Sequence, residues 1–371
     1  MKKLTVGVYA NDQGAIDVTT SFLAVAKLDD DLDLIQIPGL NIPVSPELLE
    51  RLSTSDALVL GISSGLAAGI EARLAWQALE RNPALSGRIL FLEDFPESSG
   101  TKDLDVYQIG WHAQLCSIMP VPENAPERSV YGQVHTVGYP DHWITDMQNI
   151  QKGTDLRTNG HLRKKRRGTT EMIPVGPNDL VVYFSGFKEP KTEERVLQQL
   201  LSIESVRGKT LLVHFRAHPG ERNRPELQEA IAARDALLQG QWEIENPEVI
   251  DAGRLTNSLL TGLSDIVVAH PGTTSNFYMS PLRKKMICVM EVVAPKDRAR
   301  ESYDYALTGR NTYLIEKIGD IPTAITALAT DNSLESVALR RKQKRNALQF
   351  DPQSPPSYGT NVLRVLKEIL E

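Results

Sequence analysis

Two short stretches hold the side chains best able to bind an anion or to transfer a proton. The first is LLVHFRAHPGER, in which Arg216, His218 and Arg222 follow an apolar run. Guanidinium groups bind phosphate or carboxylate through paired, charge-assisted hydrogen bonds. An imidazole can donate to a phosphate oxygen or act as an acid toward a leaving group. A packed histidine among solvated charges at the end of a strand is the alternative interpretation.

The second stretch is SDIVVAHPGTTSNFYMSPLRKKMICV, which begins at Ser264. The turn that ends its β-branched run contains His270, Gly272, Thr273, Thr274 and Ser275. Glycine lets backbone approach a ligand closely, and hydroxyl groups beside the amides of a helix start form a seat for phosphate. An ordinary helix N-cap explains the same residues taken alone. Two such turns on strands of one sheet are less readily explained as capping, so we predict an anion site.

The elements that must position these turns are indicated by the apolar pattern. Short, nearly all-apolar runs at residues 4–9, 57–62 and 88–92 alternate with helical patterns. A second series of the same kind begins at residue 179. Such runs are typical of parallel strands that are covered on both faces. The predicted fold class is therefore α/β, with two Rossmann-like domains in tandem and the ligand cleft between them.

The domain boundaries follow shifts in composition. We place an N-terminal Rossmann-like domain at residues 1–150, a linker at 151–178, a C-terminal Rossmann-like domain at 179–350 and a C-terminal helix at 351–371. The linker is polar and contains the basic run RKKRR, which begins at Arg163 and ends at Arg167. Such a run can contact an anionic glycan or form a peripheral membrane contact. A solvated, mobile linker is the alternative.

Composition and charge argue against several classes of protein. The net charge of −6 and the pI near 5.8 are unsuited to nucleic-acid binding, which needs a basic face. Cys116 and Cys288 lie in apolar stretches and fit buried thiols in a reducing compartment. The histidines and cysteines show no zinc spacing, so no metal site is predicted. Because we find neither a secretion signal nor a membrane-spanning window, we expect a cytoplasmic protein of bacterial type.

The two anion-binding stretches resemble the motifs of a known group of enzymes. HPGER after one strand and HPGTTSNF after another look like the His-Pro and Ser/Thr motifs of bacterial sialyltransferases and polysialyltransferases. A comparable arrangement is found in CDP-glycerol polymerases and, more distantly, in UDP-N-acetylglucosamine 2-epimerases. All have the GT-B fold of two Rossmann-like domains. VHTVGYPDHW, which begins at Val134, is similar to the strand and Gly-x-Pro turn that often closes the first of these domains.

The resemblance implies a nucleotide-sugar donor in the C-terminal half and a glycan or other small acceptor in the N-terminal half, with no separate cofactor. His218 would meet the donor phosphate, and Thr273, Thr274 and Ser275 would hold the phosphates. This sequence departs from the pattern at His270, where the epimerases carry an acidic residue. Many members also place a glutamate a few residues after the hydroxyl turn, where this sequence has Asn-Phe-Tyr from residue 276.

A third turn opens the second domain, in the place where such folds meet the diphosphate or sugar of the donor. It contains Ser185, Gly186 and Lys188, which we predict as donor contacts. A glycine-bearing turn is also routine in a βα unit, so the alternative is architectural.

The general base is sought in the N-terminal half. Asp12, Asp17, Glu93 and Asp94 follow predicted strands there. We prefer Asp12, because a loop with Gly14 opens toward the expected cleft. In sialyl transfer this carboxylate would take the proton of the acceptor hydroxyl, while His218 stabilises the departing nucleotide.

The predicted function is that of a metal-independent glycosyltransferase, which moves a sugar or polyol-phosphate unit from a nucleotide-activated donor to an acceptor. Two alternatives remain open at this point. One is a sugar-nucleotide epimerase or hydrolase on the same fold. The other is a non-catalytic protein that binds a nucleotide sugar or an anionic glycan.

Overall fold

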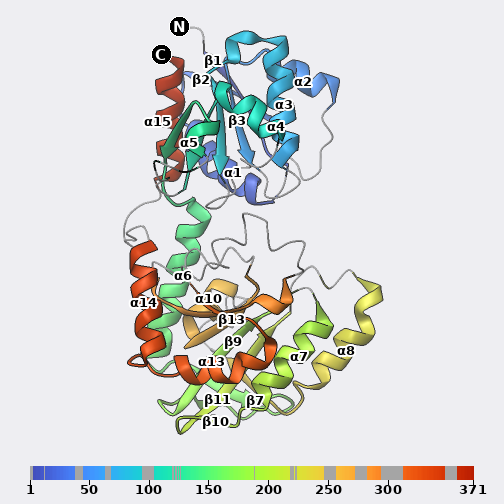
Figure 1. Cartoon of the computed structure of the whole chain (residues 1–371), viewed down its shortest axis with the longest axis vertical. Helices are drawn as coiled ribbons and strands as arrows, with labels where there is room; N and C mark the ends of the chain where they lie inside the picture. The colour runs from blue at the N-terminus through green and yellow to red at the C-terminus, as the bar shows by residue number, and fades with distance from the viewer. Residues whose placement is uncertain are drawn as a thin grey trace. The chain divides into compact units, whose positions relative to one another are not determined.

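The computed structural model divides the chain into two compact units (Figure 1). Unit 1 comprises Met1–Thr145 and Gln353–Glu371, and unit 2 comprises Asp146–Pro352. The residues that the structure describes are 3–11, 13–37, 45–62, 68–93, 104–118, 121, 123, 125, 127–187, 189–217, 221, 224–245, 256–271, 282–293, 312–346 and 357–371. Each unit is built on its own central sheet.

The sheet of unit 1 has six strands, and every neighbouring pair is parallel. The strands are β1 (Leu4–Tyr9), β2 (Leu32–Ile37), β3 (Ala57–Ile62), β4 (Ile89–Glu93), β5 (Ala113–Ser117) and β6 (Gln133–Thr136). Their order is β2-β1-β3-β4-β5-β6. Strands β3, β4 and β5 are buried along their whole length, as their continuous apolar runs predict.

Helices from both ends of the chain belong to unit 1. They are α1 (Gln13–Ala26), α2 (Pro46–Ser53), α3 (Ala68–Arg81), α4 (Leu104–Ile109), α5 (Glu127–Val130) and α15 (Tyr358–Leu370), with 3₁₀ turns at Pro83–Leu85 and Gly110–His112. The red C-terminal helix α15 lies with the blue unit in Figure 1 and packs on α1. A Cβ atom on Gly359 would come within 2.2 Å of the Ser21 carbonyl oxygen, so only glycine fits this contact.

The main sheet of unit 2 is parallel except at one edge. Its strands are β9 (Asp179–Ser185), β10 (Ser205–Val206), β11 (Lys209–Arg216), β13 (Ile266–Ala269), β14 (Lys285–Val289) and β15 (Tyr313–Ile315). The order is β10-β11-β9-β13-β14-β15, and the short β10 pairs antiparallel with β11. The prediction of two Rossmann-like α/β domains is therefore confirmed at the level of the sheets.

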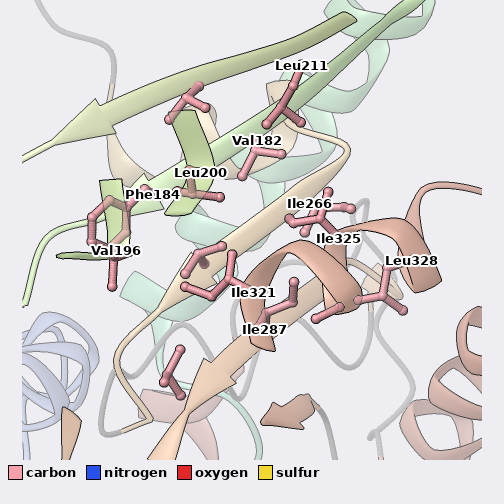
Figure 2. Close-up of a cluster of buried hydrophobic side chains, with 14 of the residues drawn as sticks. Val182, Phe184, Val196, Leu200, Leu211, Ile266, Ile287, Ile321, Ile325 and Leu328 are labelled. Carbon is pink, nitrogen blue, oxygen red and sulfur yellow. The ribbon is translucent and has the colours of Figure 1, made fainter. Parts of the chain in front are cut away.

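One face of this sheet carries the main hydrophobic core of unit 2. The helices of the unit are α7 (Pro190–Leu201), α8 (Gln228–Ala236), α10 (Asn257–Leu263), α13 (Ile321–Leu328) and α14 (Leu334–Asn346), with 3₁₀ turns at Pro225–Leu227, Met290–Val292 and Ile318–Asp320. Figure 2 shows Val182 and Phe184 of β9 facing side chains of α7 and α13. Alternation along a strand therefore sends Tyr183 and Ser185 to the opposite face.

The predicted linker at residues 151–178 has secondary structure of its own. It contains the second half of α6 (Asp141–Thr158) and the strands β7 (Arg163–Arg166) and β8 (Ile173–Pro174). Strand β7 joins β12 (Trp242–Glu245) and β8 in a small antiparallel sheet. Helix α6 packs tightly on α10, where a Cβ atom on Gly262 would lie 2.2 Å from the Ile150 carbonyl oxygen.

No helix within the part of the chain that the structure describes combines the length and the apolar character needed to cross a membrane.

Candidate functional site

The candidate site lies at the carboxyl edge of the unit 2 sheet, where the connections change direction. From β9 the chain passes first to β11 on one side and later to β13 on the other. In open α/β sheets, such a switch point leaves a crevice outside the strand ends, and ligands bind there. Ser185 ends β9, Arg216 ends β11, and His270 follows β13 directly. The sheet therefore brings these three predicted residues to one edge.

The register of the strands fixes this neighbourhood. Arg216 pairs with Ser185 across β11 and β9, and Val268 pairs with Phe184 across β13 and β9. Gly186, the fourth predicted residue that the structure describes, continues from Ser185. The other predicted site residues lie outside the described residues; they are Asp12, Lys188, His218, Arg222, Gly272, Thr273, Thr274 and Ser275. Their roles remain predictions.

The turn between β9 and α7 is held by its own backbone amides. The Gly186 N–H donates to the Arg216 carbonyl oxygen at 2.9 Å, and the Phe187 N–H donates to Glu193 Oε1 at 2.5 Å. The Phe187 ring packs edge-on against the ring of His270, with 5.8 Å between centroids. These two amides are thus engaged within the protein. The turn offers a ligand its side chains and carbonyl groups rather than these N–H groups.

A buried ionic cluster lies behind this turn, and we call Glu193, Glu221 and Arg234 the triad. Arg234 Nη1 contacts Oε2 of Glu193 and, at 2.6 Å, Oε2 of Glu221. All three residues are at most 2% exposed. Arg234 also donates from Nε to Asp235 at 2.9 Å and lies 4.8 Å above the centre of the Phe215 ring.

The triad holds two carboxylates against one guanidinium. Burial, reinforced by the nearby Glu221, raises the pKa of Glu193 to about 7, although the Phe187 N–H and Arg234 oppose the rise. Burial pulls the pKa of Arg234 down, but the surrounding carboxylates outweigh this effect and raise it. Arg234 is therefore a fixed positive charge, and burial favours the protonated form of Glu193.

A few polar side chains lie near the candidate site on the face of the sheet opposite this core, among buried apolar residues such as Val181 and Leu212. In the strand register, His214 of β11 lies opposite Tyr183 of β9. This pair comes two residues before the pair of Arg216 and Ser185. Burial, together with the positive charges of Arg167 and Arg216, lowers the pKa of His214 to about 4, so its imidazole is neutral near pH 7. The Tyr183 hydroxyl donates to Asn257 Oδ1 at 3.1 Å. The buried polar groups on the same face as the Arg216 side chain are therefore neutral near pH 7.

In unit 1, the side chain of Glu93 joins two neighbouring strands. Its Oε2 accepts hydrogen bonds from the Ser117 hydroxyl at 2.7 Å and from the Ile118 N–H at 3.1 Å, and the residue is 1% exposed. Glu93 thus ties the end of β4 to the end of β5. Asp17 accepts a hydrogen bond from the Gln13 side chain at 2.7 Å. The preferred base, Asp12, and the candidate Asp94 lie outside the described residues.

Metal ligation finds no support within the described ranges. They contain no group of three or more His, Cys, Asp or Glu side chains that could hold a metal ion. Neither Cys116 nor Cys288 forms a disulfide, both are buried, and burial raises the pKa of each thiol to about 12. Metal independence itself remains a prediction.

The members of the triad are the residues that sequence reasoning missed. Glu193 occupies the apolar stripe of α7, three, four and seven residues before the buried Val196, Leu197 and Leu200. Arg234 is the buried residue of α8, three residues after the partly buried Ile231 and four before Leu238, which is buried just beyond the end of the helix. A charged residue inside an apolar stripe must find a partner, and this is the signal that could have found both.

Comparisons with known proteins bear on the fold. No protein-family model matches the sequence, and no curated protein matches it. Among solved structures, MurG of Acinetobacter baumannii is similar at 12% sequence identity and a TM-score of 0.52, covering 98% of this chain and 99% of that chain. The UDP-GlcNAc 2-epimerase of Neisseria meningitidis, bound to UDP-GlcNAc, is 11% identical with a TM-score of 0.52, covering 99% of this chain and 100% of that chain.

The wall teichoic acid polymerase TagF, in a structure with CDPG, is also 11% identical, with a TM-score of 0.50 over 99% of this chain and 90% of that chain. At such low identity the likeness concerns the fold and leaves the reaction open. The chain therefore has the GT-B fold, two Rossmann-like domains in tandem, that its motifs predicted.

Proposed function

We propose that the protein is a glycosyltransferase that moves a sugar or polyol-phosphate unit from a nucleotide-activated donor to an acceptor. The observation that carries the proposal is the meeting of Ser185, Arg216 and His270 at the switch point of the unit 2 sheet. This is where α/β sheets bind ligands, and the residues there suit phosphate. The fold shared with MurG and TagF supports the same class of function.

The roles divide between the units. Unit 2 would bind the donor, with Arg216 and His218 at the end of β11 and the hydroxyl turn of Thr273, Thr274 and Ser275 beyond β13. Unit 1 would bind the acceptor and supply the base, for which Asp12 remains our candidate. Catalysis would rest on positioning and on electrostatic stabilisation of the leaving nucleotide, without an obligatory metal.

The structure gives little support to the peripheral membrane contact that the sequence predicted for the basic run. Lys164 Nζ lies 2.7 Å from Asp179 Oδ1, and Lys164 and Arg166 both stack on the Trp242 ring at 5.0 Å. The register also places Glu243 opposite Lys165. Several charges of the run are therefore used inside unit 2. Location in the cytoplasm likewise remains a prediction.

Ligand binding is the first test. We expect one of CMP, CDP, UDP or their sugars to raise the melting temperature, since a ligand at a hundred times its Kd stabilises a fold by about 2.7 kcal/mol. Release of free nucleotide should then increase when a suitable glycan or polyol acceptor is added. Failure of every nucleotide to bind would contradict the proposal.

The same assays separate the alternatives. Conversion of UDP-GlcNAc to its 2-epimer without an acceptor would show an epimerase. The similarity to the Neisseria epimerase structure is the reason for this test. Binding without any turnover would show a non-catalytic protein. His218→Ala should abolish donor binding or turnover with the melting temperature nearly unchanged. A large loss of stability with intact binding would assign His218 to the structure instead.

A further inference from the structure

The triad connects the β9–α7 turn, which the proposed function assigns to the donor, to a second turn that begins at Glu221. At one end, Glu193 accepts the Phe187 N–H and so holds the turn that follows Ser185 and Gly186. At the other end is Glu221, whose carbonyl oxygen accepts the Arg224 N–H at 3.1 Å. Glu221 stands three residues after His218 and directly before Arg222. Arg234 contacts both carboxylates through a single nitrogen, Nη1.

Chain connectivity carries the restraint from Glu221 to its neighbours. Three residues of fully extended chain span at most about 10 Å, and consecutive Cα atoms are about 3.8 Å apart. Fixing Glu221 therefore confines the reach of His218 and Arg222, whatever their conformation. The glutamate in HPGER, Glu221, thus binds Arg234 and fixes the position of its segment. The sequence alone did not predict this role.

Stability alone is a poor reason for this arrangement. Buried ion pairs seldom stabilise a fold more than well-packed apolar side chains of similar volume, because removing charges from water is costly. Here two carboxylates share one guanidinium and are at most 2% exposed. Asp235, whose side chain is half-exposed, adds a third carboxylate to the same guanidinium. What apolar packing cannot provide is a directional link between a backbone amide in one turn and a carboxylate in another.

We propose that Arg234 is a positioning residue, which through Glu193 and Glu221 ties the β9–α7 turn to the turn closed by the Glu221–Arg224 hydrogen bond and so holds the β9–α7 turn in place for the donor phosphates. The donor part of this statement rests on the proposed function. The physical link, by which a substitution at one turn alters the backbone of the other turn, does not depend on the proposed function.

The variants that test the link are Glu193→Gln, Glu221→Gln and the double variant. Glutamine keeps the shape and one hydrogen bond but removes a charge from the excess, so we expect melting temperatures that are unchanged or higher. The matched control is Asp179→Asn, which breaks the buried pair with Lys164 at the opposite end of the same strand, β9.

Hydrogen exchange gives the first measurement and needs no ligand. Glu221→Gln should speed exchange in the peptide that covers residues 184–189, and Glu193→Gln should speed it in residues 216–224. Asp179→Asn should change neither peptide. If each substitution affects only its own turn, the link does not exist and the inference is overturned.

Calorimetric titration with CDP and with UDP gives the second measurement. We expect each single variant to bind the nucleotide about tenfold more weakly, within the range of ordinary coupling between sites. The double variant should be no weaker than the singles, since both break one link. Unchanged affinity, or additive losses, would overturn the role in donor positioning. If the unaltered protein binds no nucleotide at all, the proposed function fails, and the link is then decided by hydrogen exchange alone.

Discussion

The backbone and the side chain of Arg216, at the end of β11, can be tested separately by substitution. Its carbonyl oxygen accepts the Gly186 N–H and holds the neighbouring turn, whereas its side chain lies on the same face of the sheet as Ser185 and His214. A side-chain substitution keeps the backbone bond. The consequence is that binding can be tested at this position without dismantling the turn.

For Arg216→Leu we expect loss of nucleotide binding with little change in the free energy of unfolding. A hydrogen bond to a charged group contributes about 1.5–3 kcal/mol, so the Kd should rise at least tenfold. Titration calorimetry measures the Kd, and thermal unfolding checks stability. Lys209→Met, at the other end of the same strand, is the control and should bind normally. Equal losses in both variants would assign the effect to general charge rather than to the site.

Single residues also show what the sequence could and could not predict about the site. Arg216 and His270 were predicted because a side chain directly after an apolar run must lie at the carboxyl edge of a parallel sheet. The link from Glu193 through Arg234 to Glu221 could not be predicted as a link, because its members are 13 to 41 residues apart and meet through the packing of α7 on α8. Only the charged interruption of two apolar stripes pointed to it.

At the scale of elements, strands were predicted better than the polar helix α6. The run at residues 4–9 coincides with β1 and the run at 57–62 with β3, because buried parallel strands are continuously apolar. Helix α6 buries only a narrow stripe, with Trp143, Met147 and Ile150. Its fit to α10 depends on glycine and on tertiary hydrogen bonds, such as that from Ser258 to Asp146 at 2.5 Å. These residues recur at helical spacing, but α6 buries no large apolar side chain after Ile150, so its second half resembles a linker in sequence.

Two elements of unit 2 should give opposite pH dependences. Glu193 on α7 has its pKa raised from 4.5 to about 7, so folding favours its protonated form, and its contribution falls as pH rises from 4.5 to 7. His214 on β11 has its pKa lowered from 6.5 to about 4, so its contribution is full above pH 6.5 and is lost as pH falls toward 4. The two trends oppose each other between pH 4.5 and 6.5.

Each variant should therefore reveal the trend of the other group. In Glu193→Gln, stability should rise more steeply with pH across this window than in the unaltered protein. In His214→Asn it should instead fall as pH rises. Each difference is at most about 3 kcal/mol, from 1.36 kcal/mol per pKa unit. Denaturant unfolding at intervals of half a pH unit measures both curves. Parallel curves for all three proteins would show that neither group titrates in this window.

At the scale of the whole molecule, the chain builds two separate cores and returns to the first with its last helix. Glycine marks a tight helix contact in each unit. On α15, Gly359 approaches the Ser21 carbonyl oxygen of α1, and on α10, Gly262 approaches the Ile150 carbonyl oxygen of α6. A Cβ atom would lie 2.2 Å from the oxygen in both cases, so the two positions form a matched pair for one substitution.

Alanine at either glycine should force the backbones apart and destabilise its own unit by about 1–3 kcal/mol. Of the four tryptophans only Trp242 lies in unit 2, whereas Trp76, Trp111 and Trp143 lie in unit 1. Fluorescence can thus follow unit 1 alone in a Trp242→Phe background, and the difference from the unaltered protein follows unit 2. We expect Gly359→Ala to lower the first transition and Gly262→Ala the second. If each substitution lowers both transitions equally, the two cores unfold as one cooperative structure, and the C-terminal helix stabilises unit 2 as well as unit 1.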